Sequence, residues 1–180
     1  VFIAEGSSCR FSSLDESEIV RKTIEQRSAY AIEALSSLGV SDYKFYDLPC
    51  GRLDTVPIIE INKIIENELR HFQPDTVLTH SDLDINNDHR IVNRSVMMAT
   101  RPGVFRRLKK VAIFEIQSSS EWNFVDVFLP NYFIELTEED VQRKWRALSY
   151  FKTETSQYPH PRSYEGMLTL AKSRGMQVGV

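Results

Sequence analysis

The chain has 180 residues, of which 42% are hydrophobic and 26% charged, with a formal net charge of −3. These values are typical of one soluble globular domain, and so mild a charge gives no indication of binding to nucleic acid or to a membrane surface. No apolar run approaches the roughly 20 residues of a membrane span. The two cysteines, Cys9 and Cys50, are too few for a disulfide framework and favour a cytoplasmic location.

Predicted strands and helices alternate through the first two-thirds of the sequence. Short apolar runs predict the strands, and apolar residues at helical spacing predict the helices. We expect strands at residues 1–4, 43–48, 76–79 and 111–115, and helices that begin at Leu14-Asp15-Glu16, Thr55 and Asp88. This alternation predicts βαβ units with right-handed crossovers. The predicted fold class is α/β, with a Rossmann-like, doubly wound and mostly parallel sheet sandwiched by helices.

The last third of the sequence adds a predicted hairpin and two helices. Residues 125–128 and 132–136 are strand-like and flank a predicted turn at Pro130-Asn131. The sequence Thr137-Glu138-Glu139-Asp140 predicts the capping-box start of a helix. A last helix is expected from Tyr164 to Gly175. No internal repeat or linker divides the chain, so residues 1–180 are expected to form a single domain.

Six polar residues crowd into the ten positions that follow the third predicted strand. They are His80, Asp82, Asp84, Asn86, Asp88 and His89. In open α/β sheets the functional site lies at the carboxyl ends of the strands, which is where this cluster falls. Carboxylates and imidazoles buried so close together would be costly without a purpose. Because Asp oxygen and His nitrogen are common zinc ligands, the cluster predicts a site for a divalent metal.

Two other interpretations of the cluster compete with a metal site. Asp and Asn are common turn and N-cap residues, and Asp88 could cap the next helix, but capping accounts for one or two residues rather than six. Four of the residues also match the odd-numbered positions of an EF-hand calcium loop. However, Asn87 replaces the required Gly and Asn93 replaces the required Glu. The support for the calcium interpretation is therefore weak.

One long stretch and several shorter segments carry a family resemblance. Pro74-Asp75-Thr76-Val77-Leu78-Thr79-His80 runs into Asp84-Ile85-Asn86-Asn87-Asp88-His89-Arg90, and the shorter matches are Arg27, Leu38-Gly39, Phe114-Glu115, residues 118–122 and 128–131, and Lys144. In this order and spacing the chain resembles the PIG-L/LmbE family of metal-dependent de-N-acetylases. The resemblance implies a truncated LmbE-like deacetylase domain over residues 1–180.

The family's His-Pro-Asp-Asp signature is absent from the chain. In relatives it precedes the strand that Val1-Phe2-Ile3 resembles, and it supplies two metal ligands and the catalytic base. The resemblance therefore implies that the N-terminal βα unit is missing, and that the fragment is inactive alone. Loss of an inner strand would leave unpaired edges and exposed apolar surface, so we also expect a homo-oligomer.

The resemblance also implies roles for the polar cluster. His89 would be the remaining ligand of a zinc ion, or of another divalent metal, and Asp88 would orient or polarise the site. Asn86 stands where some relatives carry a His that acts as an acid or oxyanion stabiliser. His80 and Asp84 would be polar partners close to the metal, although His80 could equally be an ordinary histidine at a strand end.

Two later loops are expected to reach the substrate. Family members use the loop that contains His160 and Arg162 near the site, although these charges could equally be solvated. Glu121 and Trp122 could contact a sugar, because an aromatic face beside a carboxylate suits a pyranose ring, although Trp122 could equally be plain packing.

The expected function is therefore zinc-dependent hydrolysis of the acetamide of an N-acetylglucosamine-type sugar conjugate. The alternative is a non-catalytic α/β module that binds a sugar or a partner chain.

Overall fold

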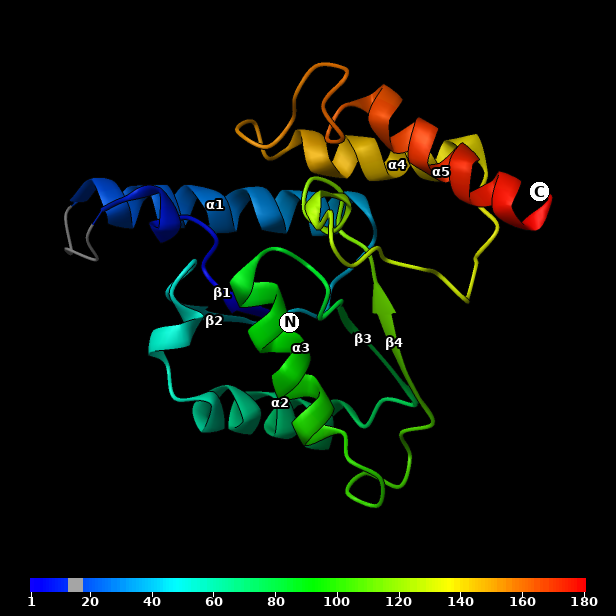
Figure 1. Cartoon of the computed structure of the whole chain (residues 1–180). Helices are drawn as coiled ribbons and strands as arrows, with labels where there is room; N and C mark the ends of the chain where they lie inside the picture. The colour runs from blue at the N-terminus through cyan, green and yellow to red at the C-terminus, as the bar shows by residue number, and fades with distance from the viewer. Residues whose placement is uncertain (13–17) are drawn as a thin grey trace.

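Strands alternate with helices in the computed structural model, which describes residues 1–12 and 18–180 (Figure 1). The strands are β1 (Phe2–Ala4), β2 (Phe45–Leu48), β3 (Thr76–His80) and β4 (Lys110–Phe114). The α-helices are α1 (Glu18–Ser37), α2 (Ile58–Phe72), α3 (Asn87–Ala99), α4 (Glu138–Ser149) and α5 (Tyr164–Val178). Three short 3-10 helices are η1 (Ser8–Arg10), η2 (Leu53–Thr55) and η3 (Ser120–Trp122). The predicted βα alternation is confirmed, but the expected helix start at Leu14-Asp15-Glu16 lies outside the described residues.

The strands pair in parallel, as predicted, but in two separate pairs. β1 pairs with β2, with Phe2 opposite Phe45. β3 pairs with β4, in a register that places Thr76 opposite Lys110 and His80 opposite Phe114. Helix α2 lies between β2 and β3 in the sequence, so this crossover carries the chain from one pair to the other. Short parallel strands flanked by helices are typical of the α/β class.

The core lies where α2 packs against α3. Its buried members are Leu53, Ile61, Ile65, Leu69, Val96 and Ala99. Ile61, Ile65 and Leu69 recur at helical spacing and form the inner face of α2. Half-buried residues of both strand pairs, among them Ile3 and Val77, pack on this core. The same two helices therefore hold both pairs.

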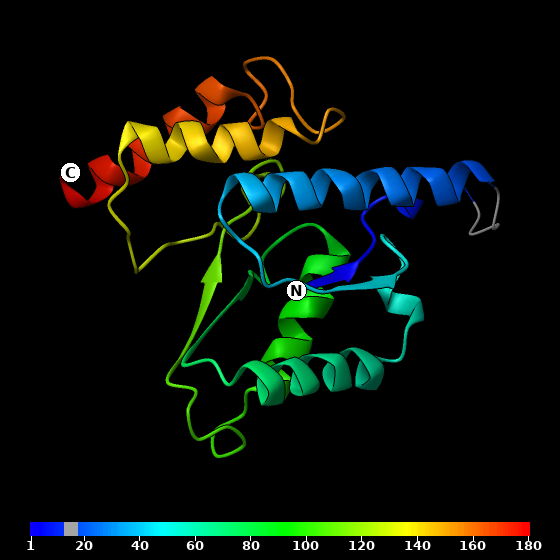
Figure 2. The same ribbon diagram turned by 180° about the vertical axis from the view of Figure 1, so that it is seen from behind.

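A second group of helices covers the other side of the strands. Helices α1, α4 and α5 lie together there, opposite α2, in both views of the ribbon (Figures 1 and 2). Arg174 joins α5 to the strands through an ion pair with Glu115, 2.6 Å long, directly after β4. Within the described residues, no helix is long and apolar enough to cross a membrane.

The helix ends follow local capping chemistry. The predicted capping box at Thr137 and Asp140 is confirmed, with both of its reciprocal contacts formed. The suggestion that Asp88 caps α3 is wrong, because the side chain of Asn86 accepts a hydrogen bond from the Asp88 amide. The predicted end of the last helix at Gly175 is also wrong. The helix continues to Val178, and the left-handed residue that ends it is Gly179.

The predicted strands at residues 125–128 and 132–136 do not form. This segment has no regular structure, and its apolar side chains are open to solvent, with Val125 86% and Leu129 82% exposed. An alternating pattern favours a strand only where a neighbouring strand offers backbone partners and a surface to cover. In the described part of the chain this segment pairs with no strand, although the Tyr132 ring lies 4.7 Å from Nζ of Lys110 in β4.

Candidate active site

Polar residues gather at the carboxyl ends of the strands. Glu5 follows β1, Cys50 lies in the turn after β2, His80 ends β3, and Ser119 lies in the loop after β4. A cavity of about 1170 Å³ opens between the strand pairs, and His80, His89 and Ser119 are among the residues that line it. The candidate site therefore lies where doubly wound sheets place their ligands.

Asp84 and His89 form the centre of this site. The Asp84 side chain is fully buried, and its Oδ2 lies 3.1 Å from His89 Nδ1, outside strict hydrogen-bond alignment. The hydroxyl groups of Ser119 and Ser120 and the amide of Asn86 donate hydrogen bonds to the same carboxylate. Burial opposes ionisation of Asp84, but Ser119, the Asn86 amide and contact with His89 together lower its pKa. An ionised Asp84 thus faces the His89 imidazole at contact distance.

His80 stacks on His89. The two ring centroids lie 4.3 Å apart with an angle of 13° between the rings, and the Phe114 ring makes a tilted contact with His80, with centroids 5.3 Å apart. Burial, together with the nearby charge of His89, lowers the pKa of His80 to about 4 against the opposing effect of Asp84. His80 is therefore neutral near pH 7. Its Nδ1 atom is buried with no hydrogen-bond partner among the described residues, so it has an unused donor or acceptor.

Asp88 holds the backbone of a neighbouring loop. It is 7% exposed, and its two carboxylate oxygens accept hydrogen bonds from the amides of Gly51 at 2.5 Å and Leu53 at 3.2 Å. These contacts fasten the start of α3 to the turn after β2. Both oxygens therefore have a structural role, although Asp88 also lines the cavity.

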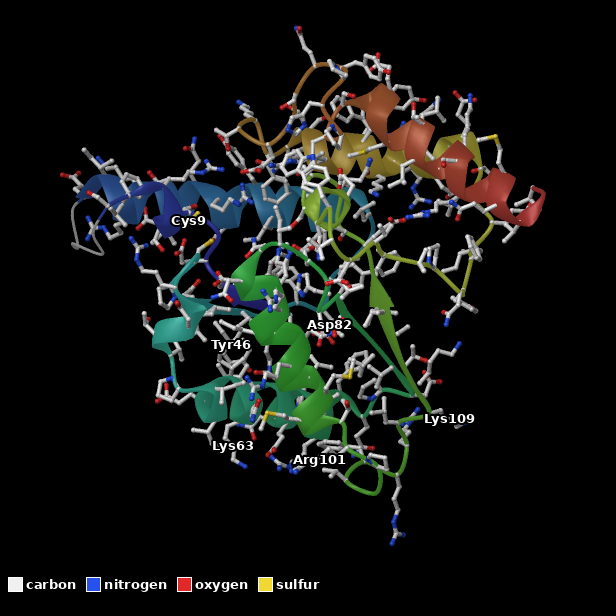
Figure 3. All side chains as sticks on the ribbon, in the orientation of Figure 1. Cys9, Tyr46, Lys63, Asp82, Arg101 and Lys109 are labelled. Carbon is white, nitrogen blue, oxygen red and sulfur yellow. The ribbon has the colours of Figure 1, made fainter. Side chains whose placement is uncertain are left out.

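The remaining members of the predicted cluster lie at its edge. Asn86 is exposed and lines the cavity, but its side-chain oxygen caps α3. Asp82, labelled in Figure 3, is also exposed and takes no part in the hydrogen bonds around Asp84.

The described residues could supply one ligand to a metal ion, but they do not form a complete metal centre. A histidine whose Nδ1 faces a buried carboxylate is the arrangement that orients metal-bound histidines, and it leaves the Nε2 atom of His89 for the metal. However, residues 1–12 and 18–180 contain no group of three or more His, Cys, Asp and Glu side chains arranged to hold a metal. Catalytic zinc sites use three protein ligands, so further donors are required.

A comparison with known protein families finds a match over the part of the chain that carries this site. Residues 1–100, more than half of the chain, match the family described as "PIG-L: GlcNAc-PI de-N-acetylase". The chain belongs to the PIG-L family. Membership indicates a hydrolase of the de-N-acetylase type. The matched residues include β1, β3, Asp84 and His89, and the family resemblance seen in the sequence is thereby confirmed.

A solved structure supports the fold of this PIG-L chain. The crystal structure of the conserved protein TT1542 from Thermus thermophilus is similar to it, with a TM-score of 0.64 over 87% of this chain and 69% of that one. The two sequences are 19% identical, so the similarity establishes the α/β fold alone. No curated protein matches the chain.

Of the residues predicted to reach substrate, some lie at or beside the cavity and one holds a loop in place. Arg162 lines the cavity, and its backbone amide donates to His160 Nδ1 at 3.0 Å. The ring of His160 meets that of Trp122 edge-on, with centroids 5.8 Å apart. Glu121 instead accepts hydrogen bonds from the amides of Ser118 and Ser119. It therefore shapes the loop that brings Ser119 to Asp84.

Sequence reasoning missed two carboxylates near the site. Glu154 is paired with Arg10, Arg27 and Arg162, and Glu5, 6% exposed, accepts hydrogen bonds from the amides of Ser7, Ser8 and Cys50. Arg10 lies 144 positions from Glu154, so no local pattern could predict that cluster. The position of Glu5 between a strand and a Gly-Ser loop was the one signal available for it.

Proposed function

We propose that the complete protein is a zinc-dependent N-deacetylase that hydrolyses the acetamide of an N-acetylglucosamine-type sugar conjugate. The observation that carries the proposal is His89, held by the buried carboxylate of Asp84 at the carboxyl ends of the strands. A metal ion bound there would supply Lewis-acid chemistry to an amide carbonyl. Membership of a de-N-acetylase family supports the same reaction type.

The chain's own residues supply binding and orientation. Ser119 and Ser120 keep Asp84 in place, and Asp84 keeps His89 in place. Arg162 lines the cavity, and its buried Nε atom has no hydrogen-bond partner among the described residues. The rings of Trp122 and His160 meet edge-on beside Arg162, and an aromatic pair next to the cavity suits a sugar.

Residues 1–180 alone are expected to be inactive. Water must add across the amide bond to give acetate and a free amine, and a base must take a proton from that water. Asp84 is committed to the serines and His89, and Asp88 to two backbone amides. Neither carboxylate is free to act as the base. The family's His-Pro-Asp-Asp unit would supply both a base and further ligands.

The test compares the chain as given with a version preceded by a βα unit that carries His-Pro-Asp-Asp. We expect amine release from N-acetylglucosamine conjugates, and stoichiometric zinc, only in the extended version. His89→Ala should abolish both, whereas His71→Ala, an exposed histidine on α2, should preserve them. An extended version that binds zinc but hydrolyses no member of a broad panel of N-acetyl sugars would refute the proposed substrate.

A non-catalytic binding module is the second candidate. It is favoured by the absence of a three-donor metal group from the described residues. This alternative predicts that the extended version binds N-acetylglucosamine in calorimetry without binding zinc and without turnover. Turnover by the extended version would exclude it.

We further propose a cytoplasmic protein that self-associates when prepared as residues 1–180. Cys9 and Cys50 are free thiols, which suits a reducing compartment. The exposed apolar side chains of residues 124–136, such as Phe124 at 88%, offer surface for association. A monomer mass by light scattering at all concentrations would contradict the second part.

A further inference from the structure

The two cysteines of the chain lie in segments that are in contact. Cys9, labelled in Figure 3, belongs to η1, which follows β1, and Cys50 lies in the turn that follows β2. The parallel pairing of β1 with β2 brings these segments together. Two hydrogen bonds join them, because the Ser8 hydroxyl donates to the Cys50 carbonyl at 3.3 Å and Arg52 donates to the Ser8 carbonyl at 3.0 Å.

The backbone of the turn makes room for Cys9. Gly51 has a φ of +73°, and a Cβ atom added to it would lie 2.6 Å from Cβ of Cys9 and 3.5 Å from its Cα. Because glycine has no Cβ, Cys9 lies directly against the residue that follows Cys50. Burial, followed by interaction with the Cys9 thiol, raises the pKa of Cys50 to about 12. The backbone contact and the thiol interaction both place the two cysteines side by side.

Both thiols are accessible and unoxidised. Cys9 is exposed and Cys50 is partly buried, and both line the cavity of the candidate site. A disulfide joins cysteines whose Cα atoms lie about 4.4–6.8 Å apart, so cysteines in touching segments need little movement to reach its geometry. An exposed thiol beside a second thiol that can resolve it is the arrangement of a redox-responsive pair.

We propose that Cys9 and Cys50 form a reversible disulfide, with a low-molecular-weight disulfide such as oxidised glutathione as the oxidant. The exposed Cys9 thiolate attacks one sulfur of the oxidant, which gives a mixed disulfide and releases one glutathione thiolate. The Cys50 thiolate then attacks the Cys9 sulfur, which closes the internal bond and releases the second glutathione. Two electrons pass to the oxidant, and the two thiol protons leave on two molecules of reduced glutathione.

The bond would fasten a loop that holds the candidate site. The Cys50 amide donates to Glu5 at 2.8 Å, and the Gly51 amide donates to Asp88 at 2.5 Å. Asp88 directly precedes His89 in the first turn of α3. A covalent link between η1 and the turn restricts the backbone that Asp88 holds, so oxidation should make this region more rigid. The two thiols are sufficient for this chemistry, which does not depend on the proposed deacetylase activity.

The experiment equilibrates the chain with mixtures of reduced and oxidised glutathione at about pH 8, where exposed thiols react. Free thiols are then blocked with N-ethylmaleimide, and mass spectrometry of proteolytic peptides identifies the products. We expect an internal Cys9–Cys50 bond, which dithiothreitol reverses. A glutathione adduct on Cys9 should precede it, because the raised pKa of Cys50 slows the second step.

Three variants make the test specific. Cys50→Ser should stop at the glutathione adduct on Cys9, and Cys9→Ser should form no internal bond. The double variant Cys9→Ser, Ser36→Cys keeps two thiols but moves the exposed one near the end of α1, outside the cavity. It should form glutathione adducts and no internal bond. Circular dichroism and urea unfolding of the reduced variants would show that each one still folds.

Amide hydrogen exchange tests the effect on the loop. In the oxidised chain we expect at least about tenfold slower exchange of residues 51–53 than in the reduced chain. Cys50→Ser treated in the same way should show no change. Unchanged exchange in a chain that carries the internal bond would overturn the proposed link to the site.

Two results would overturn the disulfide itself. One is a set of glutathione adducts on both cysteines with no internal bond at any ratio of the two glutathione forms. The other is a bond that joins two chains, detected as a covalent dimer, in place of the internal one. Internal bond formation in an extended version without turnover would refute the deacetylase function alone.

Discussion

His89 Nδ1 lies 3.1 Å from Oδ2 of Asp84, a carboxylate whose side chain is fully shielded from solvent. The pair joins the loop after β3 to the first turn of α3, and Ser119 extends it to the loop after β4. Three segments therefore converge on one carboxylate. A contact of this kind orients the imidazole and raises its basicity toward a metal.

Asp84→Asn is expected to weaken metal binding more than it weakens the fold. Asn keeps one oxygen, which can still accept from Ser119, but it puts an amide group where Oδ2 accepts from Ser120, and it removes the charge that faces His89. In the chain extended with His-Pro-Asp-Asp, zinc affinity should fall by about 10–100-fold. Competition titration with a chelating dye measures this, and Asp82→Asn, an exposed neighbour, is the matched control. Equal zinc affinities in the Asp84→Asn and Asp82→Asn variants would show that Asp84 takes no part in metal binding.

Asp88→Ala is expected to destabilise the protein. The carboxylate holds the amides of Gly51 and Leu53, which would be left without these partners at a cost of about 1.5–3 kcal/mol in the free energy of unfolding. Urea denaturation measures the loss, and Asp82→Ala should change stability by less than about 0.5 kcal/mol. Unchanged stability with lost activity in the extended chain would instead assign Asp88 the catalytic role that the family resemblance implies.

The sequence predicted the positions of helices better than it predicted which segments pair as strands. Apolar periodicity located α2 because Ile61, Ile65 and Leu69 bury the same face against α3. The same kind of evidence failed for residues 125–128 and 132–136. Their alternation satisfies local preference, but a strand also needs a paired neighbour, and that depends on the whole sheet.

The candidate site was likewise only partly predictable from the sequence. The crowding of His80, Asp84 and His89 was visible in the sequence because the three lie within ten positions. The contact of Asp84 with Ser119 spans 35 positions and depends on the pairing of β3 with β4. The cluster around Glu154 depends on how α1 packs near α4. Both contacts follow from tertiary packing, which periodicity does not report.

Ile61→Ala tests whether α2 packs in the core through this face. Ile61 is 0% exposed in the core between α2 and α3, so truncation should lower the free energy of unfolding by about 2–5 kcal/mol. Ile59→Ala on the same helix, 54% exposed, should change it by less than about 0.5 kcal/mol. Urea denaturation compares the two. Similar losses would show that α2 is not packed as described.

The two thiols are expected to differ in reactivity. Burial, with a hydrogen bond and charge interaction involving Cys9, raises the pKa of Cys50 to about 12, whereas the Cys9 side chain is exposed. The thiolate is the reactive form, so Cys50 should alkylate much more slowly than Cys9 at pH 8. Mass spectrometry after iodoacetamide treatment resolves the two sites, and Cys9→Ser serves as the control for Cys50 alone. Equal rates would contradict the partial burial of Cys50.

Glu154 is expected to make stability depend on pH in the acid range. Burial opposes its ionisation, but the guanidinium groups of Arg27, Arg162 and Arg10 outweigh burial and lower its pKa below the ordinary 4.5. A carboxyl group with a lowered pKa in the folded state stabilises the protein above its unfolded pKa, and this contribution is lost as the pH falls through the folded pKa. Glu154→Gln should therefore cost about 1.5–3 kcal/mol at pH 7 and progressively less below pH about 4.5. Urea denaturation from pH 7 to pH 3 measures the difference.

Glu66→Gln, which removes ion pairs confined to the surface of α2, should cost less at pH 7. A Glu154→Gln effect that stayed constant with pH would show that packing, rather than charge, holds the three arginines together.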